Sequence, residues 1–230
     1  MKKIVILTGA GISAESGINT FRDAGGLWEG HNVMTVASPE GWHKNQELVL
    51  NFYNERRKQA LQAKPNKGHL ALADLEKDFE VIIVTQNVDN LHEKAGSTNV
   101  IHLHGELFKV RSTLDKNLIY DLEGWEIKTG DLCEKGSQLR PHIVWFGEMV
   151  PMMEPAIEQA ADADIFMVVG TSLLVYPAAS LMHYTRSEIP KYIIDPNLPE
   201  IEPHPNIYLF EEPAGTGVPK VAEILRREFI

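Results

Sequence analysis

The sequence predicts an α/β fold in which a doubly wound parallel sheet carries a smaller lobe beside it. Apolar runs of three to five residues alternate with stretches of helical periodicity, as in a parallel sheet covered by helices on both faces. The predicted strands are residues 4–7, 81–84, 99–103, 165–169, 192–194 and 206–210. The predicted helices are residues 47–62, 67–77, 153–161, 178–185 and 219–228.

Two stretches interrupt this alternation. Residues 28–64 contain helical patterns with no strand between them, and residues 106–140 are polar and rich in turns. We interpret both as insertions that together form the smaller lobe. The sheet domain is then expected to comprise residues 1–27, 65–105 and 141–230.

Composition sets limits on location and partners. The chain has 230 residues, of which 43% are hydrophobic, and it lacks the 18 uninterrupted apolar residues of a membrane span. The N-terminus has too few consecutive apolar residues for a signal peptide, which favours a cytoplasmic location. The net charge of −10 argues against nucleic acid and suits a partner that presents lysines, although an acidic surface without such a partner fits equally well. The single cysteine, Cys133, excludes an internal disulfide and a cysteine-rich metal site.

The loop after the first predicted strand fits a dinucleotide-binding pattern. Residues 9–14 read Gly-Ala-Gly-Ile-Ser-Ala, which matches G-x-G-x-x-G/A between a strand and a helix. A glycine turn that merely joins strand to helix would look the same. The acidic residue expected about 20 positions later has no clear counterpart, because residues 19–23 read as a loop. The pattern therefore does not indicate a standard dehydrogenase.

Five ordered blocks resemble the signatures of sirtuins in kind, order and spacing. They are residues 9–23, 85–92, 102–105, 139–148 and 170–173, and the resemblance extends over nearly all of the chain. It implies a Rossmann-like NAD-binding domain with a small lobe made of a helical module and a degenerate zinc ribbon. It also implies NAD-dependent removal of acyl groups from lysines of proteins or peptides, with release of nicotinamide and O-acyl-ADP-ribose.

By this resemblance, His104 is the catalytic base, and Asn87 and Asp89 act at the cofactor. Histidine suits a base because its unperturbed pKa lies near neutral pH. A lone histidine before glycine would otherwise be a core or capping residue, and His102 is the weaker candidate. Asn87 and Asp89 follow a strand directly, at the edge of the sheet where ligands bind. Asp89 can also cap a helix.

The resemblance assigns a larger set of residues to NAD. Phe21 and Arg22 belong to a loop that closes over NAD in the family; otherwise they are a core phenylalanine and a solvated arginine. The expected cofactor-binding set is Gly9, Ala10, Gly11, Ser13, Glu15, Phe21, Arg22, Trp28, Gln86, Asn87, Val88, Asp89, His104, Gly170, Thr171, Ser172, Asn197 and Ala214.

The substrate is expected to bind as an added strand whose acyl group enters a pocket. Tyr53 and Arg56 share a helix face and match the Tyr-x-x-Arg pair of class III sirtuins, which recognises succinyl, malonyl or glutaryl carboxylates. An exposed arginine beside a packed tyrosine is the simpler alternative. The resemblance places the peptide contacts at Val144, Phe146, Gly147, Glu148 and Val175.

The zinc ribbon of most sirtuins has lost its ligands here. The two Cys-x-x-Cys pairs would fall at Ser112 and Asp115, and at Leu132 and Lys135, with Cys133 one position out of register. One cysteine cannot supply a tetrahedral site, so we expect no structural zinc. We expect Asp115 and Lys135 to pair as ions instead.

The leading prediction is a desuccinylase or demalonylase that also removes acetyl groups and works as a monomer. A plain deacetylase, a mono-ADP-ribosyltransferase and a non-catalytic NAD-binding regulatory module are the alternatives. The last is disfavoured by His104, because a pure sensor needs no base.

Overall fold

The structure, a computed structural model, describes residues 1–18, 27–28, 30–202 and 204–230 and confirms the α/β prediction. Its central sheet has parallel strands in the order β11-β10-β9-β1-β4-β5. Each predicted strand forms, with ends that differ by at most one residue from those predicted. The bounds are β1 (Lys3–Thr8), β4 (Glu80–Thr85), β5 (Val100–His102), β9 (Ile165–Val169), β10 (Lys191–Ile194) and β11 (Ile207–Phe210).

Strand β1 lies inside the sheet and marks the point where its winding reverses. The chain runs outward from β1 to β4 and β5, then returns to β9 on the other side of β1 and continues to β11. In such sheets, ligands bind at the carboxyl ends of the strands beside this reversal. The side chains of Ile4 and Ile6 face one way and those of Val5 and Leu7 the other, and all are fully buried.

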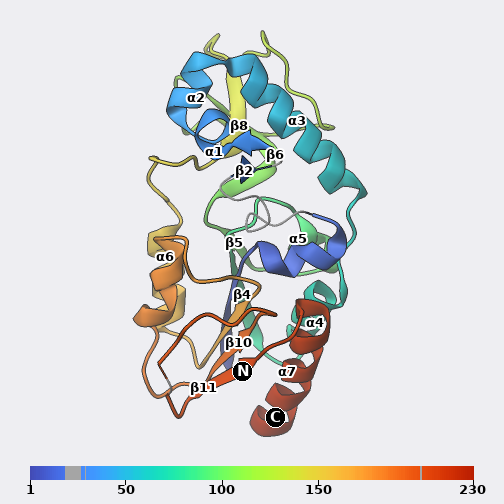
Figure 1. The fold of residues 1–230 in the computed structure, drawn as a ribbon, viewed down its shortest axis with the longest axis vertical. Helices are drawn as coiled ribbons and strands as arrows, with labels where there is room; N and C mark the ends of the chain where they lie inside the picture. Colours follow the sequence, from blue (N-terminus) through green and yellow to red (C-terminus); the bar gives the residue numbers. More distant parts are fainter. Residues whose placement is uncertain (19–26, 29, 203) are drawn as a thin grey trace.

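Helices cover both faces of the sheet (Figure 1). Leu72 of α4 and Val221 of α7 pack in the same core cluster as Ile4 and Ile6. Helix α6 and the 3-10 helix η3 pack against the opposite face, and α5 contacts α4. Their bounds are α4 (Lys67–Leu75), α5 (Leu91–Ala95), α6 (Met153–Ala161), η3 (Ala178–Tyr184) and α7 (Ala214–Phe229).

Two helices differ from the prediction in type or in start, and α4 ends at Leu75, two residues earlier than predicted. Residues 178–184 form a 3-10 helix, and α7 begins at Ala214, five positions before the predicted start at Pro219. Proline is typical of a first helical turn, which made Pro219 look like a start. The earlier start is stabilised from far along the chain, because the Glu15 carboxylate accepts a hydrogen bond from the backbone N–H of Gly215 at 2.7 Å.

The smaller lobe combines helices with an antiparallel sheet of order β7-β6-β8. It also contains a short antiparallel pair, β2 with β3, where the sequence predicted only helices; strands of two residues are too short to show alternation. Because β8 crosses residue 141, the boundary between the lobes stays a prediction. The bounds are β2 (Leu27–Trp28), β3 (His31–Asn32), α1 (Val33–Val36), α2 (Pro39–Lys44), α3 (Gln46–Gln62), β6 (Gly105–Ser112), β7 (Ile119–Asp121) and β8 (Leu139–Ile143).

Local sequence signals explain where these helices begin. The side chain of Ser38 accepts a hydrogen bond from Gly41 N before α2, and that of Asn45 accepts one from Leu48 N before α3. The lobe then buries its own core, in which Trp145 packs between the helices and the sheet. This core fixes α3 above the carboxyl edge of the central sheet.

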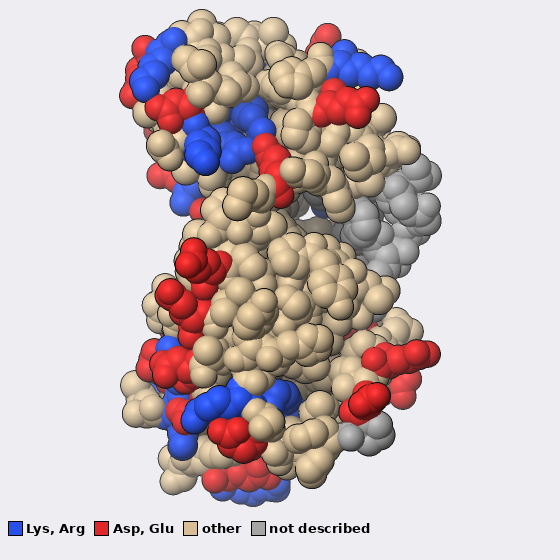
Figure 2. Space-filling model, turned by 90° about the vertical axis from the view of Figure 1, so that its left-hand side faces the viewer, with Lys and Arg blue, Asp and Glu red and all other residues tan. Residues whose placement is uncertain are grey.

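The distribution of charged side chains and the length and apolar character of the helices are relevant to the expected partners. On the face shown in Figure 2, Lys and Arg side chains lie among Asp and Glu, and a broad central area carries neither, with Asp and Glu along its left side. Within the described ranges, no helix combines the length and the apolar character that a bilayer span needs.

Candidate functional site

The loops after β1 and β9 meet at the carboxyl edge of the sheet, at the point where its winding reverses. Gly9 N donates to Val169 O at 3.0 Å, and Gly11 N donates to Gly170 O at 2.8 Å. A Cβ atom on Gly11 would lie only 2.7 Å from the Cα atom of Gly170, whose φ is +65°. These glycines are therefore required by the close approach of two backbones.

A buried hydrogen-bonded cluster joins the loop after β1 to the loop after β4. The Asn87 Nδ2 group donates to Gly9 O at 3.0 Å and to Ser13 Oγ at 3.2 Å, and Ser13 Oγ donates to Asp89 Oδ2 at 3.1 Å. The other carboxylate oxygen of Asp89 accepts from Leu91 N at 3.0 Å, and Asp89 lies one position before Asn90, the N-cap of α5. Burial raises the pKa of Asp89. The sequence-predicted residues Asn87, Ser13 and Asp89 are thus brought together.

His104 has the tautomer that a general base requires. Its Nδ1 atom lies 3.0 Å from the carbonyl oxygen of Gln86. A carbonyl only accepts, so Nδ1 carries the proton and Nε2 carries the lone pair. Burial lowers the pKa of His104, against the opposing effect of the Gln86 hydrogen bond. The imidazole is therefore neutral at pH 7 and can accept a proton.

His102 faces two acceptors. Its Nδ1 atom lies 3.2 Å from the Asn87 carbonyl oxygen, and its Nε2 atom lies 2.7 Å from Glu93 Oε1. Burial alone would lower the pKa of His102, but the hydrogen bond and charge of Glu93 outweigh burial and the pKa is raised. Both ring nitrogens of His102 already face acceptors, so neither is free to take a proton from a ligand, which favours His104 as the base.

The remaining cofactor candidates lie along the same edge. Gln86 Nε2 donates to Thr171 Oγ1 at 3.1 Å, which ties the loop after β4 to the segment Gly170, Thr171 and Ser172 after β9. Asn197 follows β10, is exposed, and donates its backbone N–H to Asp195 Oδ1 at 2.8 Å. Ala214 is buried at the start of α7.

Three predicted cofactor residues fall where little or nothing is described. Phe21 and Arg22 lie outside the described residues. Of Trp28, the structure describes the backbone in β2 and not the side chain. Their assignment to NAD stays a prediction.

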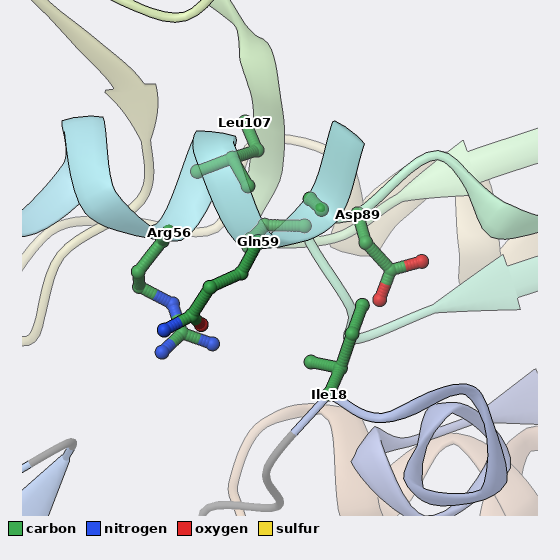
Figure 3. A pocket seen from close by; sticks show the side chains of 7 residues that line it. Ile18, Arg56, Gln59, Asp89 and Leu107 are labelled. Carbon is green, nitrogen blue, oxygen red and sulfur yellow. The ribbon is translucent and has the colours of Figure 1, made fainter. Parts of the chain in front are cut away.

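A pocket lies between α3 and the cofactor loops (Figure 3). It is open to solvent, and Arg56 and Gln59 extend into it from the same side of α3. Apart from Arg56, Gln59 and Asp89, its walls are apolar. The lining residues are Ile18, Arg56, Gln59, Ala60, Val88, Asp89 and Leu107.

Tyr53 is placed differently from Arg56. Its side chain is fully buried, and its hydroxyl oxygen accepts a hydrogen bond from Trp145 Nε1 at 3.1 Å. Arg56, one helical turn later, is 8% exposed and lines the pocket. The structure therefore brings Arg56 to the cofactor loops and holds Tyr53 against the segment of the expected peptide contacts.

The Glu148 side chain is engaged within the small lobe. Its carboxylate accepts hydrogen bonds from Arg111 Nη2 at 2.9 Å and from Arg140 Nη1 at 2.8 Å. It also accepts one from Trp145 N at 2.8 Å. Phe146, an expected peptide contact, is 46% exposed, and Leu174, next to the expected contact Val175, is 78% exposed. The Glu148 side chain is thus occupied by contacts within the chain.

A second buried chain of polar groups lies under the cofactor loops and was not singled out from the sequence. His92 Nε2 lies 3.0 Å from Thr8 Oγ1, which donates to Thr85 Oγ1 at 2.8 Å. Thr85 Oγ1 in turn accepts from Asn87 N at 3.0 Å. The signal was available, since Thr8 and Thr85 each end an apolar strand and are direct neighbours in the sheet.

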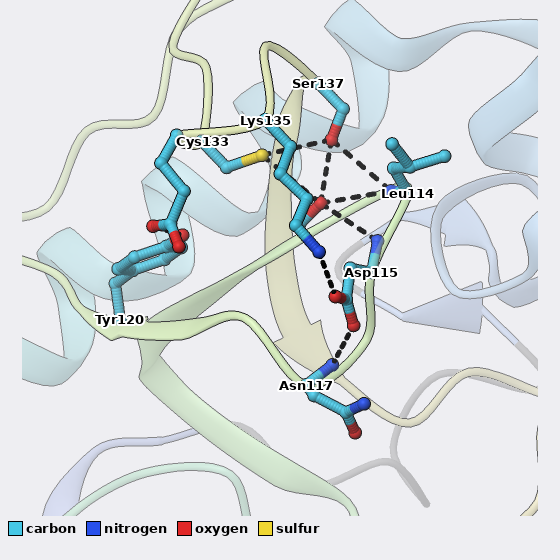
Figure 4. Close-up of polar contacts among 9 residues, drawn as sticks. Leu114, Asp115, Asn117, Tyr120, Cys133, Lys135 and Ser137 are labelled. Atoms are coloured by element: carbon cyan, nitrogen blue, oxygen red, sulfur yellow. Dashed lines mark hydrogen bonds and ion pairs between the residues drawn. The ribbon is translucent and has the colours of Figure 1, made fainter.

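The degenerate ribbon holds polar contacts at the former ligand positions (Figure 4). Lys135 Nζ lies 2.8 Å from Asp115 Oδ2, which confirms the predicted ion pair. Beside it, the hydroxyl oxygens of Ser112 and Ser137 lie 2.7 Å apart, and Cys133 Sγ lies 3.3 Å from Ser137 Oγ. One thiol and two hydroxyls do not fit a tetrahedral zinc site. Among the residues described, no three His, Cys, Asp or Glu side chains form a metal-binding group.

Comparison with known proteins accounts for this arrangement. The Sir2 family matches residues 9–177. An NAD-dependent protein deacylase of Bacteroides thetaiotaomicron is 53% identical over 230 residues, which cover 98% of each chain. A solved Sir2 homologue in complex with NAD has a TM-score of 0.88 and 40% identity, covering 98% of this chain and 90% of that one. A Sir2 structure with an acetylated peptide has a TM-score of 0.78 and 32% identity, with 98% and 92% covered. The chain therefore belongs to the Sir2 family.

Proposed function

We propose that this protein removes succinyl and malonyl groups, and also acetyl groups, from protein lysines. As a Sir2 family member it is an NAD-dependent protein-lysine deacylase. NAD is its cofactor. The acidic acyl preference is the finer part of the proposal, and the position of Arg56 in the pocket beside Asp89 carries it.

The pocket suits an acyl chain that ends in a carboxylate. Arg56 is 8% exposed, and a guanidinium there can pair bidentately with a carboxylate. Val88, Leu107 and the other apolar walls can pack against the methylene groups of the chain. Tyr53 remains in the proposal as a substrate residue, with its hydroxyl oriented by Trp145. An acetyl group offers no carboxylate with which Arg56 could pair.

The residues of the site fit NAD through the donors and acceptors at the carboxyl edge. When bound, NAD supplies the ADP-ribosyl group that accepts the acyl group as nicotinamide leaves. His104 would take the proton of a ribose hydroxyl at Nε2, and the Gln86 carbonyl, 3.0 Å from Nδ1, would stabilise the imidazolium. Asn87 is assigned to the ribose and Asp89 to the nicotinamide carboxamide. Ser13 holds both side chains in place.

The lysine substrate is proposed to bind as an extended segment between two backbone edges. One edge contains Gly147, whose φ is +87°, and the other contains Val175. Main-chain pairing gives affinity with few demands on sequence, so the acyl group would dominate recognition. Acyl-lysine proteins or peptides are then the partners; the cytoplasmic location and the monomeric state stay predictions.

The deciding experiment compares kcat/KM on one lysine peptide that carries acetyl, malonyl or succinyl, with and without NAD. We expect NAD-dependent turnover that favours the acidic groups. Arg56→Met should lower kcat/KM for succinyl at least about tenfold, since a charged hydrogen-bonded pair is lost, and change acetyl less than about twofold. Lys64→Met, which removes an exposed cation just after α3, is the control.

Three outcomes would reject the acidic preference. Equal or better use of acetyl by the unaltered enzyme would make it a plain deacetylase, with Arg56 a structural residue. ADP-ribose retained on the protein substrate would instead indicate a mono-ADP-ribosyltransferase. NAD binding without turnover of any acyl group would favour a regulatory module.

A further inference from the structure

We propose that His102 and Glu93 form a positioning pair that holds the Asn87 peptide group in the geometry needed at the cofactor. The inference rests on the proposed role of Asn87 and adds two residues to the machinery of the reaction. Neither residue is assigned to touch the reacting atoms, so both act through Asn87.

Two histidines hold two consecutive carbonyl groups. His104 Nδ1 lies 3.0 Å from Gln86 O, and His102 Nδ1 lies 3.2 Å from Asn87 O. The two histidines, at the end of β5 and in the turn that follows, thus each contact one carbonyl group of the segment after β4 with a side chain. The contact with the Gln86 carbonyl oxygen is made by His104, the proposed base. The contact between His102 Nδ1 and the Asn87 carbonyl oxygen is not made by the base, and we assign it the role of positioning Asn87.

Glu93 keeps His102 in its gripping orientation. Glu93 Oε1 lies 2.7 Å from Nε2, while the His102 side chain is only 9% exposed. Because both ring nitrogens face acceptors, only the imidazolium can donate to both at once. The charged groups around the ring are Glu93 and His92 on α5, Glu106 and Lys109 on β6, and Asp89.

Asn87 is held from several sides, and the pair supplies the carbonyl contact. Its N–H donates to Thr85 Oγ1, and its Nδ2 group donates to Gly9 O and Ser13 Oγ. Without His102, the peptide group between Asn87 and Val88 loses its carbonyl partner in a buried region, which favours rotation of that group. Rotation would shift Asn87, Val88 and Asp89 together, since they are consecutive or nearly so.

The test separates the two contacts of the ring. In His102→Asn, the amide nitrogen replaces Nδ1 and can still donate to Asn87 O. In His102→Gln, the amide nitrogen replaces Nε2, which keeps the Glu93 contact and loses the Asn87 contact. We expect His102→Gln to raise KM for NAD about tenfold with a smaller fall in kcat, and His102→Asn to stay within about threefold of the unaltered enzyme.

Glu93→Gln tests the other half of the pair. Loss of the carboxylate should lower the pH at which KM for NAD begins to rise, because His102 then deprotonates more readily. Glu158→Gln, an exposed change on α6, is the matched control and should leave the pH profile unchanged.

Several outcomes would overturn the proposal. It fails if His102→Gln leaves both KM and kcat unchanged. It also fails if the Asn and Gln variants lose activity equally and in step with Tm, which would indicate a structural role alone. Asn87→Ala serves as the reference: normal kinetics there would remove the premise. These variants are assayed with both acetyl and succinyl peptides, so a failure of the positioning pair can be distinguished from a failure of the acidic acyl preference.

Discussion

The guanidinium of Arg57 donates a hydrogen bond from Nε to the carbonyl oxygen of Leu107 at 2.7 Å, deep inside the small lobe. Arg57 is fully buried and also donates to Asn54 Oδ1 at 2.7 Å and to Trp125 O at 3.1 Å. Asn54 in turn exchanges two hydrogen bonds with the backbone of Ile127. The Arg57 side chain therefore links α3, strand β6 and the segment around residue 125, in a lobe whose ribbon lacks zinc ligands.

Arg57→Met is expected to destabilise the fold more than a surface change does. The substitution leaves buried carbonyl groups without donors, which costs about 3 kcal/mol. For a chain of this size, that corresponds to a fall in Tm of roughly 6–12 °C. Thermal unfolding followed by circular dichroism measures it, with the exposed Arg227→Met as control. A fall no larger than that of the control would show that the lobe is held elsewhere.

Chelation is expected to leave both stability and activity unchanged. Ser112, Ser137 and Cys133 contact one another, and Asp115 pairs with Lys135, at the positions where ribbon ligands would stand. Tm and kcat/KM should be the same before and after dialysis against EDTA. A lower Tm that added zinc restores would show that another donor set binds metal.

Gln59→Leu is expected to weaken use of acidic acyl groups selectively. Gln59 and Arg56 extend into the same pocket from α3 (Figure 3), where the amide can donate to a carboxylate bound by Arg56. We expect kcat/KM for succinyl to fall about tenfold, mainly through KM, with acetyl nearly unchanged. Gln62→Leu, the same change one turn later on an exposed position, is the control. Equal losses for acetyl and succinyl would assign Gln59 to packing.

The acid limb of the kcat/KM profile is expected below pH 6.5. Burial lowers the pKa of His104 beneath that ordinary value, so the base stays unprotonated into mildly acidic solution. A profile from pH 5 to 9 measures the limb, and Asp89→Asn tests whether Asp89 contributes to it. A limb at or above 6.5 in the unaltered enzyme would contradict the assignment of His104 as base.

The fold is expected to lose stability as the pH falls from 6.5 toward 4. Burial lowers the pKa of His69 to about 4, while in the unfolded chain it has its ordinary value of 6.5. Below 6.5 the unfolded chain binds a proton that the folded chain does not, so acid favours unfolding across this window. His92, whose ring centroid lies 5.0 Å away, has its pKa lowered by burial and acts with the same sign.

His69→Gln should flatten part of this dependence. Glutamine at this position can retain the capping box with Asn66 while removing the titrating group. Tm measured at pH 7.5 and pH 5 tests it, with the exposed His43→Gln as control. If the Tm difference between the two pH values stays as large as in the unaltered protein, His69 does not carry the effect.

The central sheet could be predicted because its strands are buried on both faces and read as apolar runs, such as Ile4 to Leu7. Strand β6 was not assigned because only some of its residues are buried, and its polar side chains resemble a loop. The start of α7 was missed because its stabilising partner, Glu15, lies 200 positions away from Gly215. Such contacts depend on the tertiary fold and have no local signal.

The candidate site likewise combines features that could be predicted from the sequence with contacts that could not. The loops that follow β1, β4 and β9 could be placed together from the parallel sheet alone, and so could His104 by resemblance. The contact between His102 and Glu93 could not, because their spacing indicates neither a helix pair nor neighbouring strand positions. The Tyr53 hydroxyl bond to Trp145 joins residues 92 positions apart and was equally hidden.

The close contact of Gly9 and Gly11 with Gly170 couples the loop after β1 to the loop after β9. The amide hydrogens of Gly9 and Gly11 are both donated to residues at the end of β9, so neither loop can open without breaking its neighbour's contacts. Their amides should consequently exchange with solvent in a single cooperative event. A ligand that orders one half of the cofactor cradle thereby slows exchange in the other half, without touching it.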